Sequence, residues 1–224
     1  MAMIRRFPHG PILGIAPFNF PLNLVAHKVA PALAAGCTVV LKPSEVAPLN
    51  AFILAEIIDG LGLPAGVFNL VNGDGPGVGT DLSTHPDVEM ISFTGSARAG
   101  AAITKASADT FKRVCLELGG KDPAYVLPDC DLQHAIDNVM DGAFYNSGQC
   151  CCGIERIYVH KDHYKRFVDG FIDLAKTYSL GDPLDKATVI GPMAQGRFAD
   201  VVRAQRDEAL RKGARAHLGL AHPK

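Results

Sequence analysis

The chain has 224 residues, of which 48% are hydrophobic and 20% are charged. This length and composition fit one large or two small globular domains with a substantial hydrophobic core. The formal net charge of −1 provides no basic surface for DNA or RNA, and the sequence contains no uninterrupted apolar run long enough to cross a membrane.

The N-terminal sequence and the cysteines bear on the compartment. In MAMIRRFPHG, Pro8 and Gly10 stand where a signal peptide needs an apolar segment, so we expect no secretory signal there. Of the six cysteines, three are consecutive at 150–152, and neighbouring cysteines rarely pair with each other. The spacing is not that of a secreted disulfide framework, and we therefore expect a cytoplasmic protein with reduced thiols.

Short apolar runs alternate with longer helical patterns through the first half of the chain. The runs predict strands at 11–16, 38–41, 67–71, 88–93 and 113–118, and the patterns between them predict helices at 22–35, 48–61 and 96–106, with a short helix after Gly75. Pro31 lies inside the first helix and predicts a kink there. Strands that alternate with helices and are apolar throughout are typical of a parallel sheet covered on both faces.

The pattern changes near Gly119 and Gly120, where we place a domain boundary between residues 1–118 and 119–224. Beyond it the sequence predicts strands at 124–127 and 156–159 and helices at 131–146, 163–176 and 197–212. The predicted fold class is therefore α/β. It consists of a parallel Rossmann-like sheet with helices on both faces, followed by part of a second α/β domain.

Unusual dipeptides follow several of the predicted strands. They are Phe18-Asn19, Lys42-Pro43, Gly75-Pro76, Gly95-Ser96 and Gly119-Gly120. In an open parallel sheet the carboxyl ends of the strands lie on one edge, and ligands bind beyond that edge. The dipeptides therefore predict a ligand site there.

The segment at 148–153, GQCCCG, contains a candidate nucleophile. A catalytic cysteine needs access and a lowered pKa, and a glycine-rich turn provides the access. Two alternatives stay open on the residues alone. The cysteines could be buried as small hydrophobic residues, or they could bind a metal, although thiolate metal sites usually space their ligands as in C-x-x-C.

Two further side chains could take part in such chemistry. Glu117 ends an apolar strand before two glycines, where desolvation would raise its pKa and suit it to act as a general base. The more common use of such a residue is as a turn or capping carboxylate. Asn19 lies between Pro17 and Pro21 and could donate a hydrogen bond to an oxyanion, although an Asx-turn is its more common use.

Polar groups after two other strands could bind a nucleotide. Lys42 and Glu45 could donate to and accept from a ribose, or could be a solvated loop pair. The backbone amides at Gly95-Ser96 could bind a phosphate at a helix N-terminus, or Ser96 could simply cap the helix. The usual dinucleotide-binding fingerprint does not match here.

In their order and spacing, PFNFP, KPSE, GDGPGVG, FTGS, LELGGK and GQCCC resemble the motifs of the aldehyde dehydrogenase superfamily, over nearly the whole chain. The resemblance implies NAD-dependent oxidation of an aldehyde to a carboxylic acid, with NAD preferred to NADP, through a cysteine thiohemiacetal and a thioester. It implies that Cys151 is the nucleophile, Glu117 the general base and Asn19 the oxyanion-hole amide.

The same resemblance implies a cofactor site and a substrate site. The implied cofactor residues are Ala16, Pro17, Phe18, Asn19, Lys42, Ser44, Glu45, Gly75, Pro76, Phe93, Gly95, Ser96, Leu118 and Gly119. Glu45 favours NAD, because the 2′-phosphate of NADP would meet a negative charge. Leu24, His27 and Tyr145 are implied to line the substrate funnel, and the polar His27 favours a small or polar aldehyde.

The resemblance also implies a partial chain, which lacks the family's N-terminal segment and the C-terminal part of its catalytic domain. Two alternatives follow: an impaired chain that at most binds nucleotide, and a relative that passes the thioester to coenzyme A. Glu117 disfavours the second, because a base that activates water favours hydrolysis. We expect an aldehyde as the small-molecule partner, and no metal, nucleic acid or membrane. Full-length relatives are expected to be homodimers or homotetramers.

Overall fold

The computed structural model describes residues 2–218. Met1 of the first predicted domain and residues 219–224 of the second lie outside the described residues. The chain divides into two compact units, Met1–Gly119 and Gly120–Lys224. We call them the first unit and the second unit.

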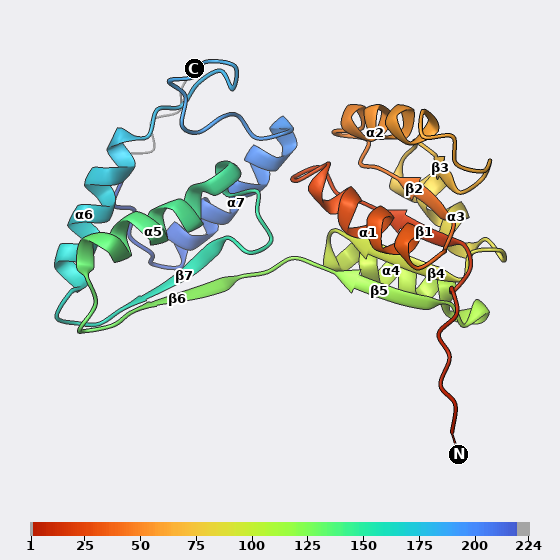
Figure 1. The fold of residues 1–224 in the computed structure, drawn as a ribbon. Helices are drawn as coiled ribbons and strands as arrows, with labels where there is room; N and C mark the ends of the chain where they lie inside the picture. Colours follow the sequence, from red (N-terminus) through yellow and green to blue (C-terminus); the bar gives the residue numbers. More distant parts are fainter. Residues whose placement is uncertain (1, 219–224) are drawn as a thin grey trace. The chain divides into compact units, whose positions relative to one another are not determined.

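The first unit contains a five-stranded parallel sheet with the order β3-β2-β1-β4-β5 (Figure 1). Its strands are β1 (Ile12–Ile15), β2 (Val39–Lys42), β3 (Phe68–Leu70), β4 (Met90–Thr94) and β5 (Arg113–Glu117). β1 pairs with β2 on one side and with β4 on the other. The sheet therefore grows outward from β1 in both directions, which creates a switch point between β1 and β4.

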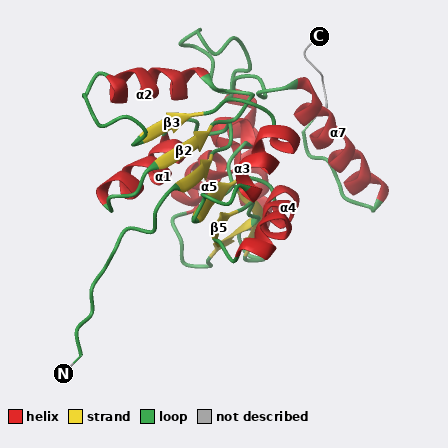
Figure 2. Cartoon of the chain, turned by 90° about the vertical axis from the view of Figure 1, so that its right-hand side faces the viewer, coloured by secondary structure: helices red, strands yellow, loops and turns green. Residues whose placement is uncertain are grey.

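Helices cover both faces of this sheet, as predicted (Figure 2). One face packs against α1 (Asn23–Ala34) and α2 (Leu49–Asp59), through a cluster that includes Val29 and Leu41. The other face packs against α3 (Thr80–Thr84) and α4 (Ala97–Ser107), through Leu82, Ile103 and the fully buried Ile91. The central strands are buried because each face has its own helical layer.

The edge strand β5 departs from the prediction of a sheet that is covered throughout. Val114 and Leu116 pack into the cluster beneath α3 and α4. Arg113, Cys115 and Glu117 alternate with them and are exposed. Because α1 and α2 pack on the strands at the other side of the sheet, the second face of β5 has no helix of the first unit over it.

Two short elements complete the first unit. The predicted helix after Gly75 is a π-helical turn, η1 (Gly75–Gly79), which leads directly into α3. The side chain of Asp74 begins η1 by accepting a 2.9 Å hydrogen bond from the Gly77 N–H. A 3₁₀ turn, η2 (Ala108–Thr110), follows α4. Helix α1 runs through Pro31 as one element.

The second unit begins with a βαβ arrangement (Figure 1). Its parallel strands are β6 (Asp122–Val126) and β7 (Ile154–Val159), and α5 (Leu132–Phe144) connects them before a 3₁₀ turn, η3 (Tyr145–Gly148). Two further helices follow, α6 (Tyr164–Thr177) and α7 (Gly196–Arg211). The core contains Val126 from β6, Ile136 and Val139 from α5 and Phe167 from α6.

Within residues 2–218, no helix combines the length and the apolar character that a membrane crossing requires.

Candidate active site

The strand ends of the first unit bring most of the predicted cofactor residues to one edge of the sheet. Ile15 at the end of β1 lies opposite Lys42 on β2 and Phe93 on β4. The loops that begin after these strands carry the segments 16–19, 43–45 and 95–96, while 75–76 follows β3 and 118–119 follows β5. Because all five strands are parallel, these segments leave the sheet on its carboxyl edge, where nucleotides bind in this class of fold.

Lys42 and Glu45 form an ion pair at this edge, with 3.5 Å between Lys42 Nζ and Glu45 Oε2. The lysine is buried and also donates to the Pro43 carbonyl at 3.0 Å, whereas the glutamate side chain is 51% exposed. The Lys42 side chain passes close to Gly79 of η1. The ammonium is thus held in place, and the carboxylate stays open to a hydrogen-bond donor.

The N-terminus of α4 lies on the same edge. Ser96 caps this helix, since its Oγ accepts a 3.2 Å hydrogen bond from the Ala99 N–H. The Ser96 side chain therefore caps the helix, which was one of the two predicted roles. The backbone amides of the first helical turn are directed toward the carboxyl edge of the sheet. A Cβ at Gly95 would lie 2.5 Å from Cζ of the Phe93 ring, so a side chain there would force the ring to move.

Lys28, which the sequence analysis did not single out, is buried behind this edge. It lies on α1, and its Nζ donates to Thr94 Oγ1 at 2.5 Å. Burial lowers the pKa of Lys28, and electrostatic attraction to Cys115 and Glu117 partly opposes that shift. The sequence does contain a signal for it: Lys28 is in register with Val25, Val29 and Ala32, the buried stripe of α1. A charged residue in such a stripe needs a partner.

The structure contradicts the expectation that Glu117 is desolvated. Glu117 is exposed, because it ends the edge strand β5 on the face that no helix of the first unit covers. Asn19 is half-buried in the loop between β1 and α1. Leu24 and His27 lie one turn apart on α1, the first half-buried and the second exposed.

In the second unit, Cys151 lies at the end of a strained turn. Asn146, Ser147 and Gly148 have consecutive positive φ values of 52°, 59° and 73°. Left-handed backbone is uncommon for residues other than glycine, and its cost concentrates at functional sites. The turn ends at Gln149, and the cysteines follow at once, with Cys151 exposed.

Hydrogen bonds and one close backbone contact hold this turn. Ser147 Oγ donates to the Gly191 carbonyl at 2.8 Å, and Gln149 Oε1 accepts from the Ala194 N–H at 3.0 Å. A Cβ at Gly120 would overlap the carbonyl oxygen of Cys151. The position of Cys151 therefore depends on the segment 191–194 and on the absence of a side chain at residue 120.

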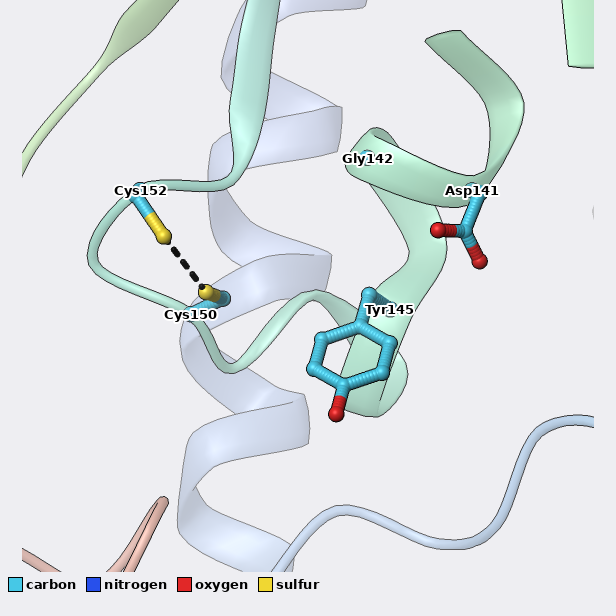
Figure 3. Close-up of a pocket in the computed structure, with 5 residues that line it drawn as sticks. All are labelled: Asp141, Gly142, Tyr145, Cys150 and Cys152. Atoms are coloured by element: carbon cyan, nitrogen blue, oxygen red, sulfur yellow. Dashed lines mark hydrogen bonds between the residues drawn. The ribbon is translucent and has the colours of Figure 1, made fainter. Parts of the chain in front are cut away.

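A small pocket lies beside the turn (Figure 3). Asp141, Gly142 and Tyr145 line it together with Cys150 and Cys152, whose sulfur atoms are 3.3 Å apart. Burial, followed by a hydrogen bond to the Cys152 side chain, raises the pKa of the Cys150 thiol. That shift keeps Cys150 protonated and makes it a poorer nucleophile. Across residues 2–218, no group of three or more His, Cys, Asp or Glu side chains is arranged to hold a metal ion.

The predicted site residues thus fall into two sets. The first unit holds the predicted cofactor residues together with Asn19 and Glu117, and the second unit holds Cys151 and Tyr145. The class of protein is α/β. Its first unit is a doubly wound parallel sheet with an ion pair and a helix N-terminus at the carboxyl edge, and its second unit carries an exposed cysteine on a strained turn.

Comparison with known proteins identifies the family. The family model described as "Aldehyde dehydrogenase family" matches residues 1–224, and the chain belongs to that family. It is 46% identical over 219 residues to 3-succinoylsemialdehyde-pyridine dehydrogenase of Pseudomonas sp., a match that covers 96% of this chain and 45% of that protein.

Solved structures agree with this membership. The fold resembles aldehyde dehydrogenase C from Pseudomonas syringae, solved as a mutant with NAD+ and octanal, with a TM-score of 0.91 and 45% identity over 94% of this chain and 43% of the other. It also resembles an NADP-dependent enzyme of E. coli, with a TM-score of 0.92 and 40% identity over 95% of this chain and 44% of the other. The chain therefore spans less than half the length of these relatives.

The close contact at Gly120 generates a first prediction. In Gly120→Ala, the added methyl group has to push the Cys151 carbonyl away, so we expect the free energy of unfolding to fall by about 1–3 kcal/mol. The rate at which iodoacetamide alkylates Cys151 should change with it. Chemical denaturation and peptide mass spectrometry measure the two quantities. Gly196→Ala is the matched control, because nothing lies within 4 Å of a Cβ there. If the two variants have the same free energy of unfolding and the same rate of Cys151 alkylation, the contact at Gly120 does not constrain the position of Cys151.

The buried lysine generates a pH prediction. Below its lowered pKa, Lys28 is protonated in both states, and burial of the ammonium destabilises the fold. As the pH rises from there toward the ordinary lysine pKa, the folded protein loses this proton first. The unfolded state then binds more protons, and the free energy of unfolding rises. Methionine does not titrate. Relative to the parent chain, Lys28→Met should therefore be most stable at neutral pH and lose that relative stability toward about pH 10.

Urea unfolding followed by circular dichroism at several pH values measures this difference. Lys105→Met, the same change at an exposed position of α4, provides the control against which the Lys28→Met difference is compared. If the difference in free energy of unfolding between Lys28→Met and the parent chain stays constant with pH, burial does not lower the pKa of Lys28.

Proposed function

We propose that this chain forms the cofactor-binding and nucleophile-bearing part of an NAD-dependent aldehyde dehydrogenase, which oxidises an aldehyde to a carboxylic acid. The observation that carries the proposal is the exposed Cys151 on a strained, hydrogen-bonded turn in a chain of this family. Strain of this kind is maintained where a side chain has to be presented to a reactant.

The proposed reaction begins at Cys151. Its thiolate attacks the carbonyl carbon of the aldehyde and forms a thiohemiacetal. The Asn19 amide and the backbone N–H of Cys151 stabilise the negative charge on the oxygen. When bound, NAD supplies the hydride acceptor, and loss of the hydride leaves a thioester on Cys151.

Hydrolysis completes the proposed cycle. Glu117 takes a proton from a water molecule, which attacks the thioester and releases the carboxylic acid with the Cys151 thiolate. The exposure of Glu117 in the first unit gives that carboxylate access to water. Lys28 lies close enough to attract the charged carboxylate electrostatically.

For the cofactor, we propose that the segments on the carboxyl edge of the first unit bind NAD. Lys42 and Glu45 bind the adenosine ribose, and the first turn of α4 binds the pyrophosphate. One structural relative was solved with NAD+ bound, and another is an NADP-dependent enzyme. We favour NAD, because the half-exposed Glu45 carboxylate would repel a 2′-phosphate.

Three residues form the proposed substrate funnel. Leu24 and His27 lie on one side of α1, and Tyr145 lies beside the cysteine turn. The polar His27 favours a small or polar aldehyde.

We also propose a cytoplasmic location. The six free thiols fit the reducing environment of the cytoplasm.

A second candidate function is acyl transfer to coenzyme A from the same thioester. The exposed carboxylate of Glu117 disfavours it, because a base that activates water favours hydrolysis of the thioester. Product formation that requires coenzyme A would favour this candidate. Under the main proposal, coenzyme A has no effect on the rate.

The nucleophile is tested by alkylation. Iodoacetamide should label Cys151 faster than the other five cysteines, and NAD should change that rate. Peptide mass spectrometry over a pH series measures this. Cys151→Ser should remove the fast phase, and Cys130→Ser should retain it. If all six cysteines react alike and NAD changes nothing, the chain does not form this site.

Cofactor preference is tested at Glu45. Glu45→Gln removes the charge that would repel a 2′-phosphate, so the ratio of the NADP dissociation constant to that for NAD should fall on the order of tenfold, about 1.4 kcal/mol. Titration calorimetry measures both constants. Glu56→Gln, an identical change at an exposed position of α2, should leave the ratio unchanged. An unchanged ratio in Glu45→Gln would remove Glu45 from the proposed ribose site.

A further inference from the structure

Two sulfur atoms flank the proposed nucleophile and lie in contact with each other. Cys150 Sγ and Cys152 Sγ are 3.3 Å apart, and both side chains face the pocket that Asp141 and Tyr145 also line (Figure 3). Cys151, which lies between them in sequence, is not one of the residues that line this pocket. The turn therefore separates the three consecutive thiols into a pair on one side and a single thiol.

The backbone keeps the pair together. The Gly153 N–H donates to the Cys150 carbonyl at 3.2 Å, which closes a tight turn around residues 150–153. A Cβ at Gly153 would itself lie only 3.2 Å from that carbonyl oxygen. Because the turn is compact, the side chains of Cys150 and Cys152 meet on the same side of it.

A metal ion does not explain this arrangement. Structural thiolate sites for zinc use four ligands. In the described part of the chain, 2–218, these two sulfurs do not belong to any group of three or more potential metal ligands. Two thiols in contact have a different reaction open to them, which is oxidation to a disulfide.

We propose that Cys150 and Cys152 are a modification site at which a hydroperoxide forms a reversible disulfide across Cys151. The two sulfurs are already in contact at 3.3 Å, and a disulfide requires them to approach to about 2.05 Å. The inference does not depend on the role proposed for Cys151, because it concerns the two thiols on either side of it.

The reaction balances with the peroxide as the oxidant. The thiolate of the exposed Cys152 attacks the terminal oxygen, the O–O bond breaks, and an alcohol, or water from hydrogen peroxide, leaves a sulfenic acid. The Cys150 sulfur then attacks the Cys152 sulfur, so that the S–S bond forms and the S–O bond breaks. The thiol proton of Cys150 leaves with the hydroxide as water. Each sulfur gives up one electron of the two that reduce the peroxide.

Cys150 and Cys152 differ in burial, and this difference fits the proposed order in which they react. Within the pair, Cys152 is exposed and reacts with the peroxide before Cys150, which is half-buried beside α5. The raised pKa of Cys150 keeps it a thiol until it resolves the sulfenic acid. An exposed disulfide of this kind is readily reduced again, which makes the modification reversible.

The test uses the full chain, reduced and then treated with a limiting amount of hydrogen peroxide. Remaining thiols are blocked with N-ethylmaleimide. Cleavage after Tyr145 and after Arg156 releases a peptide, 146–156, which contains these three cysteines and no others. We expect this peptide to lose two hydrogen atoms in mass and to carry one blocked thiol, at Cys151. If dithiothreitol is added before the blocking step, all three thiols should be blocked.

Three serine variants distinguish the pairs. Cys151→Ser should still form the disulfide, whereas Cys150→Ser and Cys152→Ser should both lose the two-hydrogen change. The parent chain unfolded in urea should form it more slowly, because the turn no longer holds the sulfurs together. The proposal is overturned if Cys151→Ser abolishes the disulfide, if either flanking variant forms it as readily as the parent chain, or if unfolding does not slow it.

Discussion

The parallel pairing of β1 with both β2 and β4 is the constraint on which the first unit depends. Ile15 lies opposite Lys42 and Phe93, so three strands end side by side and their following loops begin on the same edge. Segments that are about 25 to 80 residues apart in sequence meet there only because all these strands run in one direction. Helices on both faces bury the central strands, and that burial fixes the register which positions the loops.

The second unit positions its cysteine in a different way. No strand end presents Cys151; a turn with three consecutive left-handed residues does so, and hydrogen bonds to the segment 191–194 maintain it. Gly120 contributes by having no side chain where the Cys151 carbonyl passes. The free energy cost of the left-handed backbone at Asn146 and Ser147 is offset by these contacts. The same compact turn brings the sulfurs of Cys150 and Cys152 together, so the geometry that presents one thiol also creates a pair of thiols.

Charge burial links the edge of the first unit to its interior. Lys42 and Lys28 are both buried lysines behind the strand ends, and each has an oxygen partner, the Pro43 carbonyl and the Thr94 hydroxyl respectively. Such oxygen partners offset only part of the free energy that burial of an ammonium costs. Both lysines lie at the edge of the sheet where we propose that the nucleotide binds.

The sequence by itself determined the order and type of the elements, because apolar runs of strand length alternate with helical periodicity and glycine or proline separates them. It also determined the family, because motifs such as KPSE and LELGGK keep their order and spacing. Tertiary structure alone decided which polar residues are buried. Glu117 ends an apolar run and is nevertheless exposed, since β5 is an edge strand, and Lys28 is buried because α1 packs across the ends of neighbouring strands. The resemblance already distinguished Cys151 from its two neighbours, but only the folded turn brings the sulfurs of Cys150 and Cys152 into contact.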